Sequence, residues 1–517
     1  MREPVKSDNQ RSVKQKVQPV KPTQKSTLKK VATQKVGQPQ KTKPLSPSGQ
    51  LRKKKPVQRS KGMRLLFMAL SLSGIAMISA TAGALLAVSL ASTPLMQRQL
   101  SASEASIFKK GDRFSTRMSL QLPALTRPVN ILVLGTKVLT TDVSNAPEDL
   151  KKLPYQALVN SFEGLTDTML LLRFDPENKK VVVMSIPRDT RTYIANHGMT
   201  KINEANAYGG PALSAKSVSE LLGGVGIDRY MTINVQGVQA LVDALGGVTV
   251  HVPKDMKYQD DSQRLYINLK AGRQQLDGSK VLQLLRYRQD ENGDIGRIQR
   301  QQMVMRALME QSLNPGTVAR FPSVLGVVQS YIDTNLTVEE LVALVGFASQ
   351  VNRSNTKMLM VPGEFSSPGE YKASYWLPDP KRINGMMAQY FNYGTSSLEA
   401  PDPAALRVAI QDSTKQAKSI QTAMTALDNA GYRNVYEGQD WNEPLSVTRI
   451  VAEWGDVSSA EAIREALGFG EVRIENTGDL RSDVTVQLGR DALQPKRSVK
   501  RPTAEQPSDK STSKLSN

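Results

Sequence analysis

The sequence predicts a mixed α/β (α+β) architecture, with a large central domain flanked by helices and a small C-terminal α/β domain. Short apolar runs bounded by Gly, Pro or Asp alternate with helical periodicity over about 265 residues. A Ser/Glu/Asp/Pro-rich stretch at 396–403 interrupts this pattern, and a second, shorter alternation follows it. One long apolar segment near the N-terminus stands apart and predicts a single transmembrane helix.

The first 64 residues carry most of the net charge. They hold 19 Lys and Arg against Glu3 and Asp8, which accounts for 17 of the 20 net positive charges. The segment is rich in Gln, Pro, Ser and Thr and nearly free of aromatic residues, so we expect residues 1–64 to form a disordered basic tail. Nucleic-acid binding is the alternative, but charge alone is a weak motif. The neighbouring segment favours anionic lipid headgroups as the partner, not nucleic acid.

The transmembrane prediction rests on residues 65–97, which contain no charged side chain. Within them, the 26 residues 65–90 exceed the roughly 20 needed to cross a bilayer core. The apolar stretch and its basic leader are longer than those of a signal peptide, so we expect an uncleaved span. Basic residues before the span place the N-terminus in the cytoplasm. The sequence therefore predicts a single-pass protein of the plasma (inner) membrane, extracytoplasmic or periplasmic from about residue 101 onward.

Residues 91–128 are predicted to connect the span to the central domain, which is predicted at 129–393. Its first strand is expected at 130–135, where an apolar run ends in Gly. Strands at 168–174 and 180–186 are expected to form a hairpin joined by residues 175–178. The pattern also predicts a strand at 248–252. Helical periodicity predicts five helices, at 212–222, 235–245, 279–285, 298–313 and 337–351.

The C-terminal domain is predicted at 405–491, after a linker at 394–404 and before a disordered tail at 492–517. Its pattern indicates a βαββαβ order. The expected strands lie at 406–410, near 435, at 447–452 and at 484–488, and the expected helices at 415–429 and 459–467.

The chain lacks the residues that several common catalytic mechanisms require. The chain has no Cys, and its two histidines, His197 and His251, share no ligand spacing. Zinc catalysis and Ser-His-Asp chemistry are therefore disfavoured. No Walker loop, complete dinucleotide fingerprint or Gly-x-Ser-x-Gly elbow is present.

A dense charged group follows the helix predicted at 279–285. It comprises Arg286, Arg288, Asp294, Arg297, Arg300 and Gln301. In an extended segment Arg286 and Arg288 project to the same side, and on a helix Arg297, Arg300 and Gln301 share one face. Two converging sets of guanidinium groups suit a dense anion such as pyrophosphate. A solvated basic surface is the alternative.

Two carboxylates are predicted at one end of the hairpin. Its register places Asp167 opposite Ile186, and Asp189 lies three residues beyond that, so both emerge at the same end. Because Mg²⁺ takes one or two carboxylates plus substrate phosphates, Asp167 and Asp189 beside an arginine cluster predict a Mg²⁺–diphosphate site. In the structural alternative, Asp167 caps the strand and Asp189 pairs with Arg188 or Arg191.

Five motifs resemble the LytR-CpsA-Psr family in order and spacing. They are Asn130-Ile-Leu-Val-Leu-Gly135, Thr166-Asp167-Thr168, Ser185-Ile-Pro-Arg-Asp-Thr190, Lys201-Ile-Asn203 with Ala207-Tyr-Gly-Gly210, and Arg286-Tyr-Arg288 with Asp294-Ile-Gly-Arg297 and Arg300-Gln301. The resemblance covers residues 129–391. Residues 406–491 resemble the C-terminal domain often appended to these proteins, although Gln411-Asp412-Ser413-Thr414 stands where that domain usually has Asn-Gly.

The resemblance implies a membrane-anchored phosphotransferase that moves a glycopolymer from a polyprenyl-pyrophosphate carrier to a peptidoglycan hydroxyl, forming a phosphodiester. It implies that Asp167 and Asp189 hold Mg²⁺ or Mn²⁺, and that an apolar pocket holds the lipid. The pyrophosphate would be bound by Arg286, Arg288, Arg297, Arg300, Gln301 and Lys201. We expect Asp189, Arg288 and Arg297 to be catalytic, with Asp294 as a base or as the residue that orients Arg297. Pyrophosphate hydrolysis and a non-enzymatic role as an envelope scaffold or regulator are the alternatives.

Overall fold

The computed structural model describes the part of the chain that contains both predicted domains. The described residues are 98–108, 113–116, 123–136, 164–261, 265–287, 293–312, 314–318, 320–352, 355–395 and 402–493, with the single positions 95, 162 and 289. The predicted basic tail (1–64), transmembrane segment (65–90) and nearly all of the C-terminal tail lie outside them, as do 396–401 of the linker. None of the helices in these ranges has the length and hydropathy that a bilayer crossing requires.

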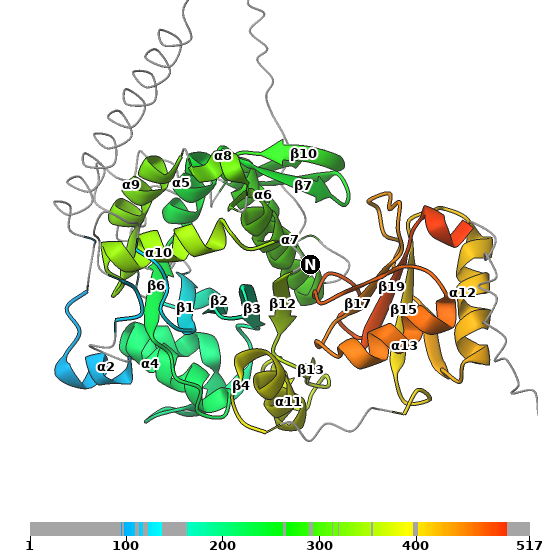
Figure 1. Cartoon of the computed structure of the whole chain (residues 1–517), viewed down its shortest axis with the longest axis horizontal. Coiled ribbons are helices and arrows are strands. Elements are labelled where there is room, and N and C mark those ends of the chain that lie inside the picture. The colour runs from blue at the N-terminus through cyan, green and yellow to red at the C-terminus, as the bar shows by residue number, and fades with distance from the viewer. Residues whose placement is uncertain are drawn as a thin grey trace, which may run out of the picture. The chain divides into compact units, whose positions relative to one another are not determined.

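A six-stranded mixed sheet forms the centre of the larger domain, in the order β11-β6-β1-β2-β3-β12 (Figure 1). β1 pairs parallel with β6 and antiparallel with β2, and β3 pairs parallel with β12. The predicted first strand and hairpin are therefore confirmed. The strands are β1 (Val129–Thr136), β2 (Thr166–Asp175), β3 (Lys180–Ile186), β6 (Arg229–Ile233), β11 (Ile332–Thr334) and β12 (Thr356–Met360).

Helices cover both faces of this sheet because its strands are apolar on both sides. Leu171 packs in a core with α4 and α11, whereas its neighbour Leu170 points to the opposite face, toward α7 and α10. α4 is interrupted at Gly209 and Gly210, so the predicted helix at 212–222 matches its second part. The helices are α4 (Ala205–Leu221), α7 (Gly293–Ser312), α10 (Val338–Ala348) and α11 (Pro380–Phe391).

A smaller layer packs beside the sheet around its own apolar core. The bounds of α5 (Val235–Leu245) and β7 (Val248–Val252) coincide with those predicted, because Asn234 caps the helix start and Gly246 ends it with a φ of 84°. The remaining elements of this layer are β8 (Met256–Asp260), β9 (Leu265–Leu269), β10 (Gly272–Leu276) and α6 (Gly278–Arg286). Two further helices follow α7, namely α8 (Pro315–Val318) and α9 (Phe321–Tyr331), and α9 packs in a core with β1 and β11 of the main sheet.

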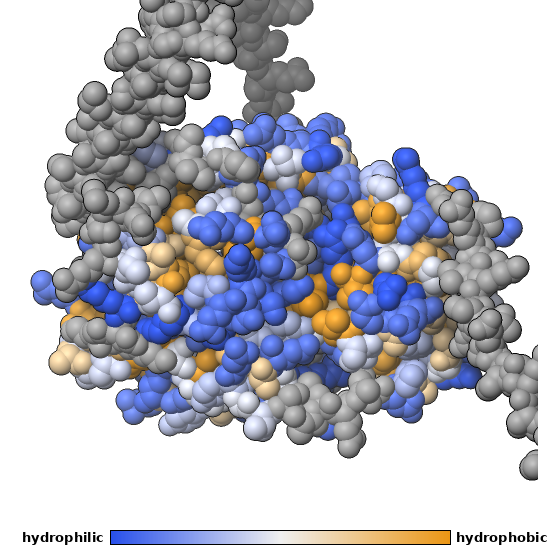
Figure 2. All heavy atoms as spheres, in the orientation of Figure 1, coloured by the Kyte–Doolittle hydropathy of each residue, from blue (hydrophilic) through white to orange (hydrophobic). Residues whose placement is uncertain are grey.

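Short elements complete the larger domain and surround the hairpin end. β4 (Arg191–Ile194) and β5 (Gly198–Lys201) form a hairpin, and so do β13 (Gly363–Phe365) and β14 (Trp376–Pro378). A short helix, α2 (Ala102–Ile107), lies in the predicted connector. In the orientation of Figure 1 the visible surface of the described residues is mostly hydrophilic, with apolar side chains in scattered patches (Figure 2).

The C-terminal domain is a five-stranded sheet with two helices packed in one apolar core. Its strand order is β16-β15-β19-β17-β18. The sequence predicts every element except β18, so the observed order is βαββαββ. The elements are β15 (Arg407–Asp412), α12 (Ala417–Asn429), β16 (Asn434–Glu437), β17 (Arg449–Ala452), α13 (Val457–Leu467), β18 (Glu471–Arg473) and β19 (Val484–Leu488).

The register of the β2–β3 hairpin differs from the predicted one by two residues. Met169, not Asp167, lies opposite Ile186. The cause is at the turn, where Asp175 still pairs with Lys180 and Lys179 takes a positive φ of 49°. A shift of two residues keeps every side chain on its predicted face, so Asp167 still emerges at the open end of the hairpin.

A buried carboxyl group makes the stability of the C-terminal domain dependent on pH. Glu453 follows β17, is fully buried, and accepts a hydrogen bond of 2.7 Å from the Thr485 hydroxyl. Burial, with a smaller contribution from the nearby Asp479, raises the pKa of Glu453 from 4.5 to about 8. Because this folded-state pKa lies above the unfolded one, the native state favours the neutral form. Its stabilising contribution is therefore full below about pH 4.5 and is lost as the pH rises through about 8.

Replacing Glu453 with Gln should raise the stability at pH 8 by about 1 to 2 kcal/mol, because an uncharged amide occupies the site at every pH. Thermal unfolding at pH 5 and pH 8 measures the effect, and the variant should show a smaller difference between the two than wild type. Glu465→Gln, on the exposed side of α13, is the control and should follow wild type. A Glu453→Gln variant that is less stable than wild type at pH 8 would contradict the assignment.

Candidate functional site

The open end of the β2–β3 hairpin carries two carboxylates joined by one arginine. Asp167 lies near the start of β2, and Asp189 follows the end of β3. Arg188 contacts both: its Nη1 lies 2.5 Å from Asp167 Oδ1 and its Nε lies 3.3 Å from Asp189 Oδ2. The expected convergence of the two carboxylates is therefore present. The pairing of Asp189 with Arg188, offered as the structural alternative, is present as well.

Asp189 is also contacted by cations from two further elements. The Lys201 Nζ, at the end of β5, lies 2.8 Å from Oδ1, and the Arg297 Nη2, on α7, lies 3.5 Å from Oδ2. The Asp189 side chain is only 14% exposed, so these charges interact in a partly desolvated setting. Together with Arg188, three cations from three segments surround one carboxylate. The three cations outnumber the two carboxylates, so the group carries a net positive charge that can attract an anion.

The predicted common face of α7 holds for two of its three residues. Arg297 and Gln301 both line a cavity beside the carboxylates, and Gln301 Nε2 donates to the Asp167 carbonyl at 3.3 Å. Arg300 is placed differently: it is 3% exposed and donates to the Tyr287 carbonyl at 2.6 Å. On a helix, Arg300 and Gln301 project about 100° apart, which sends them to different surroundings. The prediction that Arg300 shares the face of the other two is wrong.

The structure describes the other predicted site residues, Arg286, Arg288 and Asp294, only in part. Arg286 is the last residue of the helix α6, so the expectation of an extended segment that aligns it with Arg288 is wrong at Arg286. Its side chain is partly buried. Arg288 lies outside the described residues, and so does the side chain of Asp294, although the backbone of Asp294 belongs to the first turn of α7.

The cavity at this end of the hairpin joins charged and apolar walls. Its volume is about 30 Å³. The charged wall consists of Asp167, Arg188, Asp189 and Arg297, and apolar side chains that include Leu170, Ile298, Met305 and Phe365 line the rest. Leu170 and Met305 belong to an apolar layer between the sheet and the helices α7 and α10. A charged head group here would thus have an apolar layer directly behind it.

Trp376 fixes the backbone of the Asp189 segment. Its backbone N–H donates to the Asp189 carbonyl at 2.9 Å, and Thr190 forms an isolated β-bridge with Trp376. The indole is 1% exposed and packs with Ile298 of α7 and with Trp454 and Leu480 of the C-terminal domain. Sequence reasoning missed both Trp376 and the bridging role of Arg188. The only available signals were the rarity of Trp and the position of Arg188 next to Asp189.

The donor set suits a hard divalent cation that shares its coordination with a ligand. Within the described ranges, no group of three or more His, Asp and Glu residues is arranged to hold a metal ion. Asp167 and Asp189 offer two carboxylates, and water or substrate would have to supply the remaining ligands. That division of ligands is typical of Mg²⁺ bound with phosphates, so the residues fit the predicted metal.

Comparison with known proteins gives two family matches. The model described as the LytR_cpsA_psr family matches residues 95–392, more than half of the chain. The model described as LytR cell envelope-related transcriptional attenuator matches residues 405–491.

Three curated relatives illustrate the similarity. The regulatory protein MsrR of Staphylococcus aureus (strain COL) is 36% identical over 34% of this chain, and the match spans about half (52%) of its own length. TagV of Bacillus subtilis (strain 168), a polyisoprenyl-teichoic acid–peptidoglycan teichoic acid transferase, is 28% identical over 49% of this chain and 68% of its own. TagU of Oceanobacillus iheyensis, named for the same transfer, is 34% identical over 39% and 63%.

Two solved structures each cover about half of the chain. The crystal structure of TagV from B. subtilis is 25% identical, covers 52% of this chain and 99% of its own, and aligns with a TM-score of 0.42. A protein from Streptococcus agalactiae, gbs0355, is 23% identical, covers 53% and 91%, and aligns with a TM-score of 0.44.

Proposed function

Because this chain belongs to the LytR-CpsA-Psr family, we propose that it transfers a glycopolymer from a polyprenyl-pyrophosphate carrier to a hydroxyl of peptidoglycan. One observation carries the proposal: three cations from separate elements converge on Asp189 at the mouth of an apolar layer. A lipid diphosphate needs both parts, a cationic cradle for its phosphates and an apolar slot for its chain. The names of TagV and TagU, both teichoic acid transferases, support the reaction class.

In the proposed reaction, a sugar hydroxyl of peptidoglycan attacks the phosphorus distal to the carrier. A new O–P bond forms to the acceptor, the bond to the bridging oxygen breaks, and polyprenyl phosphate leaves with that oxygen and its electron pair. The hydroxyl proton is released to a base. Phosphoryl transfer asks mainly for positioning and charge stabilisation, which Arg297 and Lys201 provide by binding the nonbridging oxygens. Asp189 holds both of these cations in place.

We propose Asp167 and Asp189 as the protein ligands of a Mg²⁺ ion. When bound, the ion would neutralise charge on the pyrophosphate and on the departing phosphate. Arg188 now bridges these carboxylates, so metal binding would require its guanidinium to turn toward the phosphates. The proposed anchor is the apolar segment at 65–90, which would place the site outside the plasma membrane, close to the bilayer that supplies the lipid.

The test is transfer of a radiolabelled lipid-linked oligosaccharide to purified peptidoglycan by the full chain in detergent. We expect label in the wall fraction, joined through a phosphodiester, with polyprenyl phosphate as the second product. Chelation with EDTA should lower the rate at least tenfold, and added Mg²⁺ should restore it. Release of free oligosaccharide phosphate without wall-linked label would indicate hydrolysis instead. An intact lipid-linked substrate after prolonged incubation would indicate a binding protein.

A further inference from the structure

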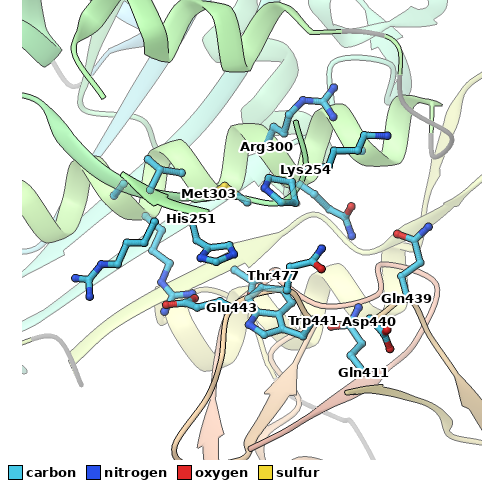
Figure 3. A pocket seen from close by; sticks show the side chains of 18 of the residues that line it. His251, Lys254, Arg300, Met303, Gln411, Gln439, Asp440, Trp441, Glu443 and Thr477 are labelled. Carbon is cyan, nitrogen blue, oxygen red and sulfur yellow. The ribbon is translucent and has the colours of Figure 1, made fainter. Parts of the chain in front are cut away.

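A second cavity of the described residues is separate from the Asp189 site. Its volume is about 450 Å³, within the roughly 300 to 1,000 Å³ typical of small-molecule sites. Figure 3 shows His251, Lys254 and Met303 on one wall and Gln411, Trp441 and Thr477 facing them from the other. The first wall comes from β7, the residues after it and α7, and the second from the C-terminal domain. Both walls belong to the same compact unit of the chain.

The lining is rich in groups that bind sugars. Side-chain amides, which donate and accept hydrogen bonds at once, come from both walls: Gln299, Gln411, Gln439 and Asn442. Gln487 Nε2 donates to Gln411 Oε1 at 3.1 Å, which orients that amide. Trp441 adds an aromatic face, and its buried indole N–H has no acceptor in the described residues. Hydroxyl and N-acetyl groups pair with such amides, and the apolar face of a pyranose ring packs on an indole.

The charged side chains that line the cavity indicate how much negative charge a bound glycan can carry. Arg306 lies 3.2 Å from both Glu310 and Glu475, and Arg449 lies 3.8 Å from Glu443. Cations and anions are thus largely balanced along the wall, and Lys254 and Arg273 add a modest positive excess. A neutral or weakly anionic chain fits this balance. A polymer with a phosphate in every unit would call for a denser row of cations.

The cavity and the Asp189 site share α7. Arg297 and Gln301 face the carboxylates, whereas Gly296, Gln299 and Met303 line the larger cavity. A ligand there would lie about one helix diameter, 10 Å, from the Asp189 site. This distance suits the acceptor of the transfer reaction, because one part of a glycan strand can be held while a neighbouring sugar reaches the phosphorus.

We propose that this cavity binds a short segment of a peptidoglycan glycan strand, an amino-sugar chain carrying acidic peptide stems. The proposal rests on the proposed function for the identity of the acceptor. It gives the C-terminal domain a role, since that domain supplies Trp441 and most of the amides.

The test is binding of tetrasaccharide–peptide fragments, released from peptidoglycan by a muramidase, to the full chain in detergent, measured by calorimetry. Trp441→Ala should weaken binding about tenfold, and it should leave the binding of inorganic pyrophosphate unchanged. A double variant with Arg273→Ala and Asn442→Ala, both exposed, should weaken binding to a similar extent with no risk to a core. Tyr266→Ala, an exposed aromatic residue on β9, is the matched control and should bind like wild type.

Two outcomes would overturn the proposal: fragments that bind wild type and both sets of cavity variants equally, or no fragment binding to wild type at all. Weaker binding of the lipid-linked donor, with fragment binding intact in Trp441→Ala, would also overturn it. Arg297→Ala separates the two proposals, because it should lose pyrophosphate binding and keep fragment binding. If wild type binds fragments through Trp441 but forms no wall-linked product, the cavity assignment holds and the transferase proposal fails.

Discussion

Replacing Asp189 with Asn is expected to lower the rate of glycopolymer transfer about 100- to 1,000-fold, because one carboxylate organises most of the site. It holds Arg188, Lys201 and Arg297 through contacts of 3.3, 2.8 and 3.5 Å. The amide keeps the shape of the side chain but removes its charge, so the three cations would repel one another. The Asn amide would also be a poorer ligand for Mg²⁺ than the Asp carboxylate. The turnover number in the lipid-linked oligosaccharide assay measures the loss.

The matched control for Asp189 is Asp261→Asn, an exposed carboxylate at the turn after β8, which should retain wild-type turnover. Thermal unfolding must show that the Asp189 variant is folded. A folded Asp189→Asn protein with turnover near wild type would remove Asp189 from the catalytic machinery, and with it the metal site proposed here.

Replacing Arg297 with Ala is expected to lower kcat/KM about 100-fold, because a bidentate guanidinium contact to the pyrophosphate would be lost. Lys at this position should recover little of the rate, since an ammonium group is a point charge and cannot form the paired contact. Calorimetric titration with inorganic pyrophosphate measures the same interaction without turnover, and affinity should fall in both variants.

Two arginines give the controls for Arg297. Arg433→Ala removes an exposed ion pair with Asp428 and should change neither affinity nor rate. Arg300→Lys tests a second arginine of α7, whose guanidinium donates to the Tyr287 carbonyl. It should destabilise the fold and leave the affinity for pyrophosphate unchanged. If Arg300→Lys lost affinity for pyrophosphate and Arg297→Ala kept it, Arg300 would be the residue that binds pyrophosphate, and Arg297 would have the structural role.

The elements that could be predicted from the sequence are those whose signals are local. β1, the β2–β3 hairpin, α5 and β7 appear where short apolar runs, Gly stops and caps indicate them. Their faces are also predictable, because side chains alternate along a strand whatever its partner. Asp167 and Asp189 could therefore be assigned to one end of the hairpin even though the predicted register was two residues off.

The features that the sequence did not reveal depend on contacts between distant segments. β12 is five residues long and pairs with β3, whose partner residues lie 175 positions earlier in the chain, so its own pattern says little about its place in the sheet. Arg300 illustrates the same limit at the site. Helical spacing puts it near Arg297, but the carbonyl that orients it comes from Tyr287, in the segment before α7.

Trp376 has a consequence for how the molecule responds to ligands. Its backbone N–H donates to the Asp189 carbonyl, and its ring packs against Trp454 of the C-terminal domain. A ligand that orders the Asp189 segment therefore also favours the state in which this indole contact is formed. By thermodynamic linkage, a change that weakens this indole contact would then weaken binding at the site, and the coupling free energy is the same in both directions. Substrate affinity and the stability of the contact between Trp376 and Trp454 are therefore expected to change together.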